Sequence, residues 1–206
     1  YHALSFEAFS QDVLKGEVIT REILNRKGLS LTYFRHPFLH TGNSKEKNDS
    51  LNIFLSDHGY TIAPVTIDNE DYLFALAYKR AKDKGDITLM KKIGSDYLDY
   101  MESKLKYFER QADLLFGRQI NQILLLHANL LNADYLDSLA KMFLKNNYEF
   151  VTMKEALEDS AYETSITVYG KWGISWIDRW ALSQGKKGDF FKGDPMTPDY
   201  IKKLSE

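Results

Sequence analysis

The sequence predicts an α/β protein built on a mainly parallel sheet or barrel. Short apolar or β-branched runs recur at residues 31–34, 60–67, 121–127 and 148–152. Amphipathic stretches with helical spacing follow them along the chain, and no repeat or low-complexity linker divides it. Strands that alternate with helices in this way are typical of parallel sheets with crossover connections.

The composition excludes several classes of protein. The chain has 206 residues, of which 44% are hydrophobic and 14% aromatic, so it can form a full core. With a formal charge of −2, the chain has no positive electrostatic field that would attract nucleic acid. No apolar stretch approaches the ~20 residues that span a bilayer. Cysteine is absent, which excludes disulfides, thiolate metal sites and cysteine nucleophiles.

The first predicted helix and strand are followed by a loop rich in polar side chains. Ser5 is a typical N-cap, and an apolar face at helical spacing continues from there toward Gly28. The strand at residues 31–34 is followed by residues 35–42, which contain one arginine, two histidines, a proline and a glycine. The alternatives are a turn with an exposed arginine and an active-site loop with Arg35 projecting inward. We favour the second, because sites are commonly built at strand ends.

The second strand ends in a cluster of acids. A helix is expected over residues 44–58, and the strand at residues 60–67 follows it and runs into Asp68-Asn69-Glu70-Asp71. Asp68 is the natural cap of the next helix, whereas another of these acids could hold a histidine on a neighbouring strand end. Residues 72–116 predict two helices broken near Gly85, long enough for part of them to form a lid or interface.

The apolar run at residues 121–126 ends abruptly in His127 and reads as a strand buried on both faces. Position alone leaves two equal alternatives for His127: a core histidine bound to a backbone carbonyl, or a site residue. Helices are then expected over residues 133–147 and 153–159.

The C-terminal tail contains all three tryptophans at a spacing of four, between residues 172 and 180. On a helix they would form one aromatic stripe. The favoured interpretation is that this stripe packs a terminal helix onto the core, and the alternative is that an exposed indole stacks on a sugar.

Three motifs at successive predicted strand ends resemble the polysaccharide deacetylase family of metal-dependent carbohydrate esterases. Residues 34–38 resemble its Arg-x-Pro-aromatic motif, residues 68–72 its Asp-x-x-Asp-Trp motif with tyrosine as the last residue, and residues 124–127 its Leu-x-His motif. The resemblance covers roughly residues 1–155. It implies an incomplete or distorted (β/α) barrel over residues 1–160 with a helical insertion, and an aromatic-rich extension at residues 161–206 packed on it.

The resemblance also implies roles for individual residues. His127 would be the general acid that protonates the leaving amine, and Asp71 would hold and tune it. Arg35 would orient the aspartate that acts as general base. Three further residues would contact the substrate: Tyr72, Leu126 and Phe38.

The chain departs from the family in its metal-binding motifs. Neither Thr-Phe-Asp-Asp nor His-(Ser/Thr)-x-x-His is present, so a divalent metal, zinc by preference, would be bound mainly by residues missing from this chain. His2 could be the last histidine of the second motif, but the family leaves several residues before the following helix, so we place His2 just beyond it. No metal ligand is therefore assigned in this chain.

Two functions follow from these motifs. The first is metal-dependent hydrolysis of N-acetyl or O-acetyl groups on a polysaccharide such as peptidoglycan or a chitin-like glycan, in the periplasm or outside the cell. The alternative is a non-catalytic glycan-binding or structural relative without the metal site. Arg35, Asp71 and His127 together favour a fragment of a normal enzyme, because an inactive relative has no reason to keep them. The sequence carries no signal of oligomeric state.

Overall fold

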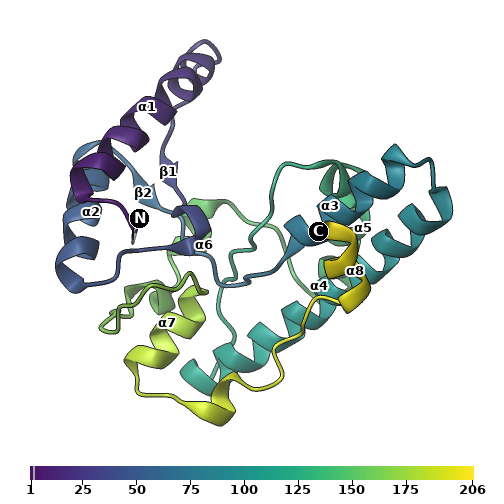
Figure 1. Ribbon diagram of the computed structural model, residues 1–206. Coiled ribbons are helices and arrows are strands. Elements are labelled where there is room, and N and C mark those ends of the chain that lie inside the picture. Colours follow the sequence, from purple (N-terminus) through teal and green to yellow (C-terminus); the bar gives the residue numbers. More distant parts are fainter. Residues whose placement is uncertain (2) are drawn as a thin grey trace. The chain divides into compact units, whose positions relative to one another are not determined.

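The computed structural model describes Tyr1 and residues 3–206, so the alternative role of His2 lies outside the described residues. The described chain divides into two compact units (Figure 1). Unit 1 comprises Tyr1–Val65 and Thr164–Lys186, and unit 2 comprises Thr66–Glu163 and Lys187–Glu206. Each unit has its own buried core and is described by itself below.

The predicted α/β barrel is wrong. The residues that the structure describes are mostly helical, with eight α-helices and one two-stranded sheet. Its strands, β1 (Tyr33–Phe34) and β2 (Thr61–Ile62), pair in parallel. The expected strand at residues 121–127 contributes only an isolated parallel bridge, and residues 148–152 form no strand. A strand needs a partner for its backbone groups, and these apolar runs have few partners within the described chain.

Unit 1 packs two helices beside the small sheet. The helix α1 (Phe6–Asn25) begins where predicted, because the Ser5 side chain accepts a hydrogen bond from the Ala8 amide at 3.1 Å. The helix α2 (Lys45–Asp57) confirms the second predicted helix, and the short 3₁₀ helix η1 (Pro37–Leu39) lies between them in sequence. The core of this region contains five apolar side chains: Tyr1, Phe9, Leu51, Leu55 and Tyr60.

The aromatic stripe of the tail lies partly on the helix α7 (Trp176–Ser183) of unit 1. Trp176 and Trp180 are buried, which confirms that they pack a helix onto the core. Trp172 precedes the helix and is 37% exposed. The stripe is therefore split between two core residues and one residue at the surface.

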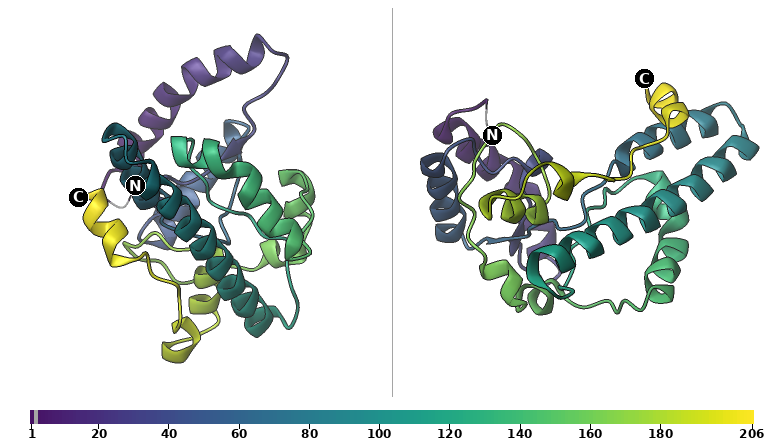
Figure 2. Two further views of the ribbon diagram at one scale, coloured as in Figure 1. Left: turned by 90° about the vertical axis from the view of Figure 1, so that its right-hand side faces the viewer. Right: turned by 90° about the horizontal axis from the view of Figure 1, so that it is seen from below.

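Unit 2 is a helical assembly centred on α3 (Asp71–Asp83). This helix packs against α4 (Ile87–Phe116), α5 (Leu130–Lys145) and α8 (Asp199–Ser205), and Figure 2 shows α4 as one long unbroken rod. The predicted break near Gly85 is confirmed between α3 and α4. The remaining helical segments are α6 (Met153–Leu157), η2 (Ser160–Glu163) and η3 (Gly188–Phe191).

The start of α3 corrects the role given to Asp68. Glu70 occupies the N-cap position, and no side-chain cap bond is present there. Asp68 instead accepts a hydrogen bond from the Asn69 amide at 2.8 Å. The acids before α3 therefore shape the turn, and Asp71 becomes the first residue of the helix.

Candidate active site

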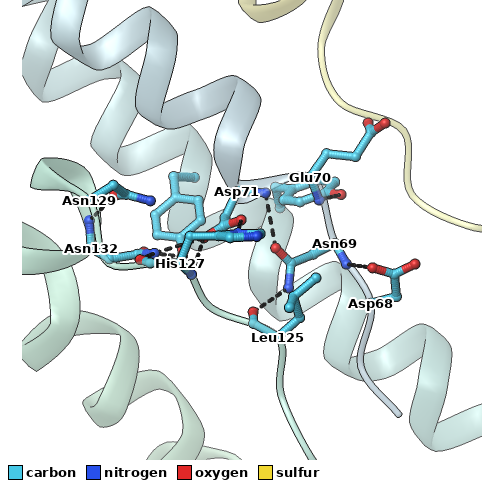
Figure 3. Close-up of polar contacts among 10 residues, drawn as sticks. Asp68, Asn69, Glu70, Asp71, Leu125, His127, Asn129 and Asn132 are labelled. Atoms are coloured by element: carbon cyan, nitrogen blue, oxygen red, sulfur yellow. Dashed lines mark hydrogen bonds and ion pairs between the residues drawn. The ribbon is translucent and has the colours of Figure 1, made fainter. Parts of the chain in front are cut away.

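One backbone bridge in unit 2 brings Asp71 and His127 together. Ile67 and Leu124 form a parallel bridge, in which the Leu125 amide donates to the Ile67 carbonyl at 3.1 Å. Each chain segment then continues for a few residues toward the N-terminus of a helix, α3 in one case and α5 in the other. The polar residues that follow the two bridged positions therefore emerge side by side (Figure 3).

Asp71 holds His127 through both carboxylate oxygens. The Asp71 Oδ1 lies 2.6 Å from the His127 Nδ1, and the Asp71 Oδ2 accepts the His127 backbone N–H at 3.0 Å. The Asp71 side chain is fully buried, whereas the His127 side chain is 42% exposed. An ionised carboxylate only accepts hydrogen bonds, so pairing with Asp71 in that form assigns a proton to the His127 Nδ1. The ring nitrogen left for chemistry is therefore Nε2.

Asn132, in the first turn of α5, completes this contact. Its Nδ2 donates to the Asp71 Oδ2 and to the His127 carbonyl, each at 2.8 Å. Its Oδ1 in turn accepts the Tyr97 hydroxyl at 2.7 Å, and its backbone N–H donates to the Asn129 side chain at 2.8 Å. Asn132 therefore fixes the carboxylate and the histidine backbone relative to each other.

Asn69 joins the two segments from the other side. Its Oδ1 accepts the Asp71 amide at 3.0 Å, and its Nδ2 donates to the Leu125 carbonyl at 2.8 Å (Figure 3). Asp71 also lies in the first turn of α3, where the helix dipole favours a negative charge. The backbone around the dyad of Asp71 and His127 is thus held by side-chain amides as well as by the bridge.

The surrounding tyrosines remain protonated donors and acceptors. Burial raises the pKa of Tyr97, and the charge of Asp71 raises it further. Burial likewise raises the pKa of Tyr100, whose hydroxyl accepts the Glu70 amide at 3.0 Å. These phenols therefore stay neutral around the buried Asp71 carboxylate.

Sequence reasoning missed the amides and Tyr97. Asn129 and Asn132 are spaced as an N-cap and the third helical residue, so the capping pattern could have located the helix start. No sequence pattern indicated that the Asn132 side chain would reach Asp71. The buried Tyr97 looked like one more apolar position on a helical face.

The other predicted site residues fall into two groups. Tyr72, which is about half exposed, and the partly buried Leu126 each adjoin a member of the dyad in unit 2. Arg35 and Phe38 belong to unit 1. Arg35 is exposed and lines a groove of about 310 Å³ between the sheet and α1, and Phe38 is 86% exposed. The structure therefore brings together Asp71 and His127, and it places Arg35 and Phe38 in the other unit.

The described residues do not fit the metal that the family resemblance implies. No three histidine, cysteine, aspartate or glutamate side chains among them gather closely enough to hold a metal ion. Asp71 also has both oxygens occupied by hydrogen-bond donors. The chemistry that this site offers by itself is proton transfer at His127 Nε2.

Comparisons with protein-family models, curated proteins and solved structures find no match for this chain. Among the described helices, none combines the length and apolar character that crossing a bilayer requires.

Proposed function

We propose that this chain supplies the general acid of a hydrolase that removes acetyl groups from the sugars of a polysaccharide. The observation that carries the proposal is the dyad, in which a fully buried carboxylate holds Nδ1 of a half-exposed imidazole. An arrangement of this kind orients a histidine for proton transfer. The substrate class rests on the resemblance of the motifs that contain Arg35, Asp71 and His127. Peptidoglycan, a chitin-like polymer or an exported glycan would fit, in the periplasm or outside the cell.

The proposed proton transfer uses the Nε2 of His127. Protonated His127 donates the Nε2 proton to the nitrogen of the tetrahedral intermediate as the carbon–nitrogen bond breaks and the carbonyl re-forms, so that the amine leaves neutral. The electron pair of the broken bond stays on that nitrogen. His127 becomes neutral and keeps the proton on its Nδ1, which donates to the Asp71 Oδ1. Catalysis of this type contributes roughly 10²- to 10⁴-fold to a rate.

The proposal is limited to this step. The described residues provide no fitting donor set for zinc, so activation of the attacking water is not assigned to them. Arg35, Phe38, Tyr72 and Leu126 remain proposed substrate or positioning residues on the strength of the resemblance.

A specific observation supports a glycan-binding module as a second candidate. Phe38 is 86% exposed. Its backbone φ is 53°, a left-handed conformation that is unfavourable for a bulky residue. Trp172, in the same unit, is also partly exposed. Exposed aromatic faces can stack on sugar rings without any chemistry.

Acetate release from chitooligosaccharide and peptidoglycan by the natural protein, assayed with added Zn²⁺ or Co²⁺, separates the two functions. His127→Gln should lower the rate by roughly 10²- to 10⁴-fold, because it removes the proton donor. His58→Gln is the matched control, since the exposed His58 also makes one Nδ1 contact, to the Phe54 carbonyl at 2.7 Å. Equal rates for the wild type and His127→Gln would contradict the enzyme. Unchanged glycan binding alongside those equal rates would support the binding module.

A further inference from the structure

Unit 1 contains a buried cationic cluster that the dyad does not use. Arg179 on α7 and His36 on the loop after β1 are each only 1% exposed. Both lie against Trp176: the His36 and Trp176 ring centroids are 5.8 Å apart, and the Arg179 Cζ is 5.6 Å from the Trp176 ring. We call these three residues the arginine cluster.

Most of the polar atoms in the arginine cluster have no partner among the described residues. The Arg179 Nη2 donates to the carbonyls of Leu39 at 2.6 Å and Trp172 at 3.3 Å. The Arg179 Nε and Nη1 are buried without a hydrogen bond, and so are both ring nitrogens of His36. Buried polar atoms are almost always satisfied in folded proteins, and each exception requires a physical reason.

The charge of the cluster is only partly compensated. Burial lowers the pKa of Arg179 to about 10, so the guanidinium still carries its charge at neutral pH. Asp178 raises this pKa, but by less than burial lowers it, and its Oδ2 accepts the Ser175 hydroxyl at 2.8 Å. His36 is neutral, because burial first and the charge of Arg179 second lower its pKa to about 3. A buried cation of this kind is costly unless an anion pairs with it.

We propose that the arginine cluster is a buried binding site for a carboxylate group. A carboxylate carries one negative charge, which matches the single positive charge of Arg179, and its planar oxygens suit guanidinium donors. Neutral His36 offers one additional ring N–H. A phosphate dianion would leave a net negative charge beside a cluster whose described side chains provide no second cation.

The carboxylate can come from two sources: a small free acid, or an aspartate or glutamate side chain of a polypeptide segment. The proposal concerns unit 1 and stands apart from the proton transfer proposed for unit 2. Its test therefore uses binding and leaves catalytic activity aside.

The test follows the ¹⁵N–¹H signal of the Arg179 Nε in the whole chain during titration. One arm adds sodium acetate against sodium chloride at equal ionic strength. The other adds acetyl-Gly-Asp-Gly-amide against the same peptide with asparagine. We expect a saturable shift of the signal, with a raised melting temperature, for acetate, for the aspartate peptide or for both. A shift with acetate alone would indicate that the ligand is a small free acid. A shift with the aspartate peptide alone would indicate that the ligand is a polypeptide segment.

Arg179→Lys should weaken this binding at least tenfold, because lysine keeps the charge but loses the planar donors. Arg118→Lys, at an exposed arginine of unit 2, should leave it unchanged. The proposal is overturned if neither carboxylate shifts the wild-type signal beyond its control. It is also overturned if Arg179→Lys retains the full rise in melting temperature. Should Arg179→Lys fail to fold, the wild-type titration alone decides.

Discussion

Replacing Asp71 tests how much the buried contact with His127 contributes to stability. Asp71→Leu removes the acceptor for three donors: the His127 backbone N–H, the His127 Nδ1–H and one Asn132 N–H. Asp71→Asn behaves differently. Its amide nitrogen can donate to Nδ1 if the imidazole moves its proton to Nε2, while its oxygen still accepts from the other two donors.

The magnitudes follow from these hydrogen bonds. In Asp71→Leu the Asn132 donor is fully buried and the two His127 donors are part-buried. Unsatisfied buried donors cost about 1–3 kcal/mol each, so the free energy of unfolding should fall by about 3–5 kcal/mol. Asp71→Asn keeps every partner but exchanges charge-assisted for neutral hydrogen bonds, which should cost about 1–2 kcal/mol.

Urea unfolding followed by far-ultraviolet circular dichroism measures both variants. Tryptophan fluorescence is unsuitable for this purpose, because Trp172, Trp176 and Trp180 all belong to unit 1. Hydrogen exchange in α3 and α5 confirms that the loss arises in unit 2. The reasoning is refuted if Asp71→Leu and Asp71→Asn are equally stable, or if Asp71→Leu costs less than about 1 kcal/mol.

Two other predictions concern pH and packing. The hydrogen bond from Arg118 holds the pKa of Asp159 at about 2, below its ordinary value of 3.8, so its stabilisation is present above pH 3.8 and is lost as pH falls toward 2. Because Arg118 is exposed and solvent screens the pair, Arg118→Gln should lower the free energy of unfolding only slightly at neutral pH and should flatten the acid part of the stability curve. An unchanged curve would contradict this. A Cβ at Gly173 would lie 1.7 Å from the Phe38 carbonyl oxygen, so Gly173→Ala should destabilise unit 1 by about 1–3 kcal/mol, measured by tryptophan fluorescence in urea. Gly16→Ala in the open middle of α1 is the matched control and should stabilise by about 0.5–1 kcal/mol; equal effects of the two alanines would refute the packing argument.

The helices could be predicted from the sequence because their signals are local. The Ser5 cap and the break near Gly85 both occur where expected, since capping and helical hydrogen bonds involve residues only a few positions apart. The strands could not be predicted in the same way. The apolar run before His127 has strand composition, but pairing depends on distant partners, and within the described chain this run forms a single bridge, between Leu124 and Ile67. The alternating pattern and the resemblance therefore led to a barrel that the described chain does not form.

The sequence analysis expected an acid after residue 67 to hold a histidine on a neighbouring strand end. In the structure, the bridge between Ile67 and Leu124 brings Asp71 and His127 into contact. Asn69 and Asn132 could not be foreseen, because a side-chain amide that bridges two segments leaves no periodic pattern in the sequence. The separation of the chain into two units was also hidden, since Arg35 and His127 stand in motifs of the same resemblance.

The protonation of His127 in the wild-type protein tests the central claim most directly. Long-range ¹⁵N–¹H correlation of the labelled imidazole at about pH 9, well above the ordinary histidine pKa, shows which ring nitrogen carries the proton. His127→Gln assigns the signal. We predict a protonated Nδ1 bound to Asp71 and a bare Nε2 that is open to exchange a proton with a substrate. A protonated Nε2 with a bare Nδ1 would contradict the proposed role of Asp71 and, with it, the proton donor of the proposed hydrolase.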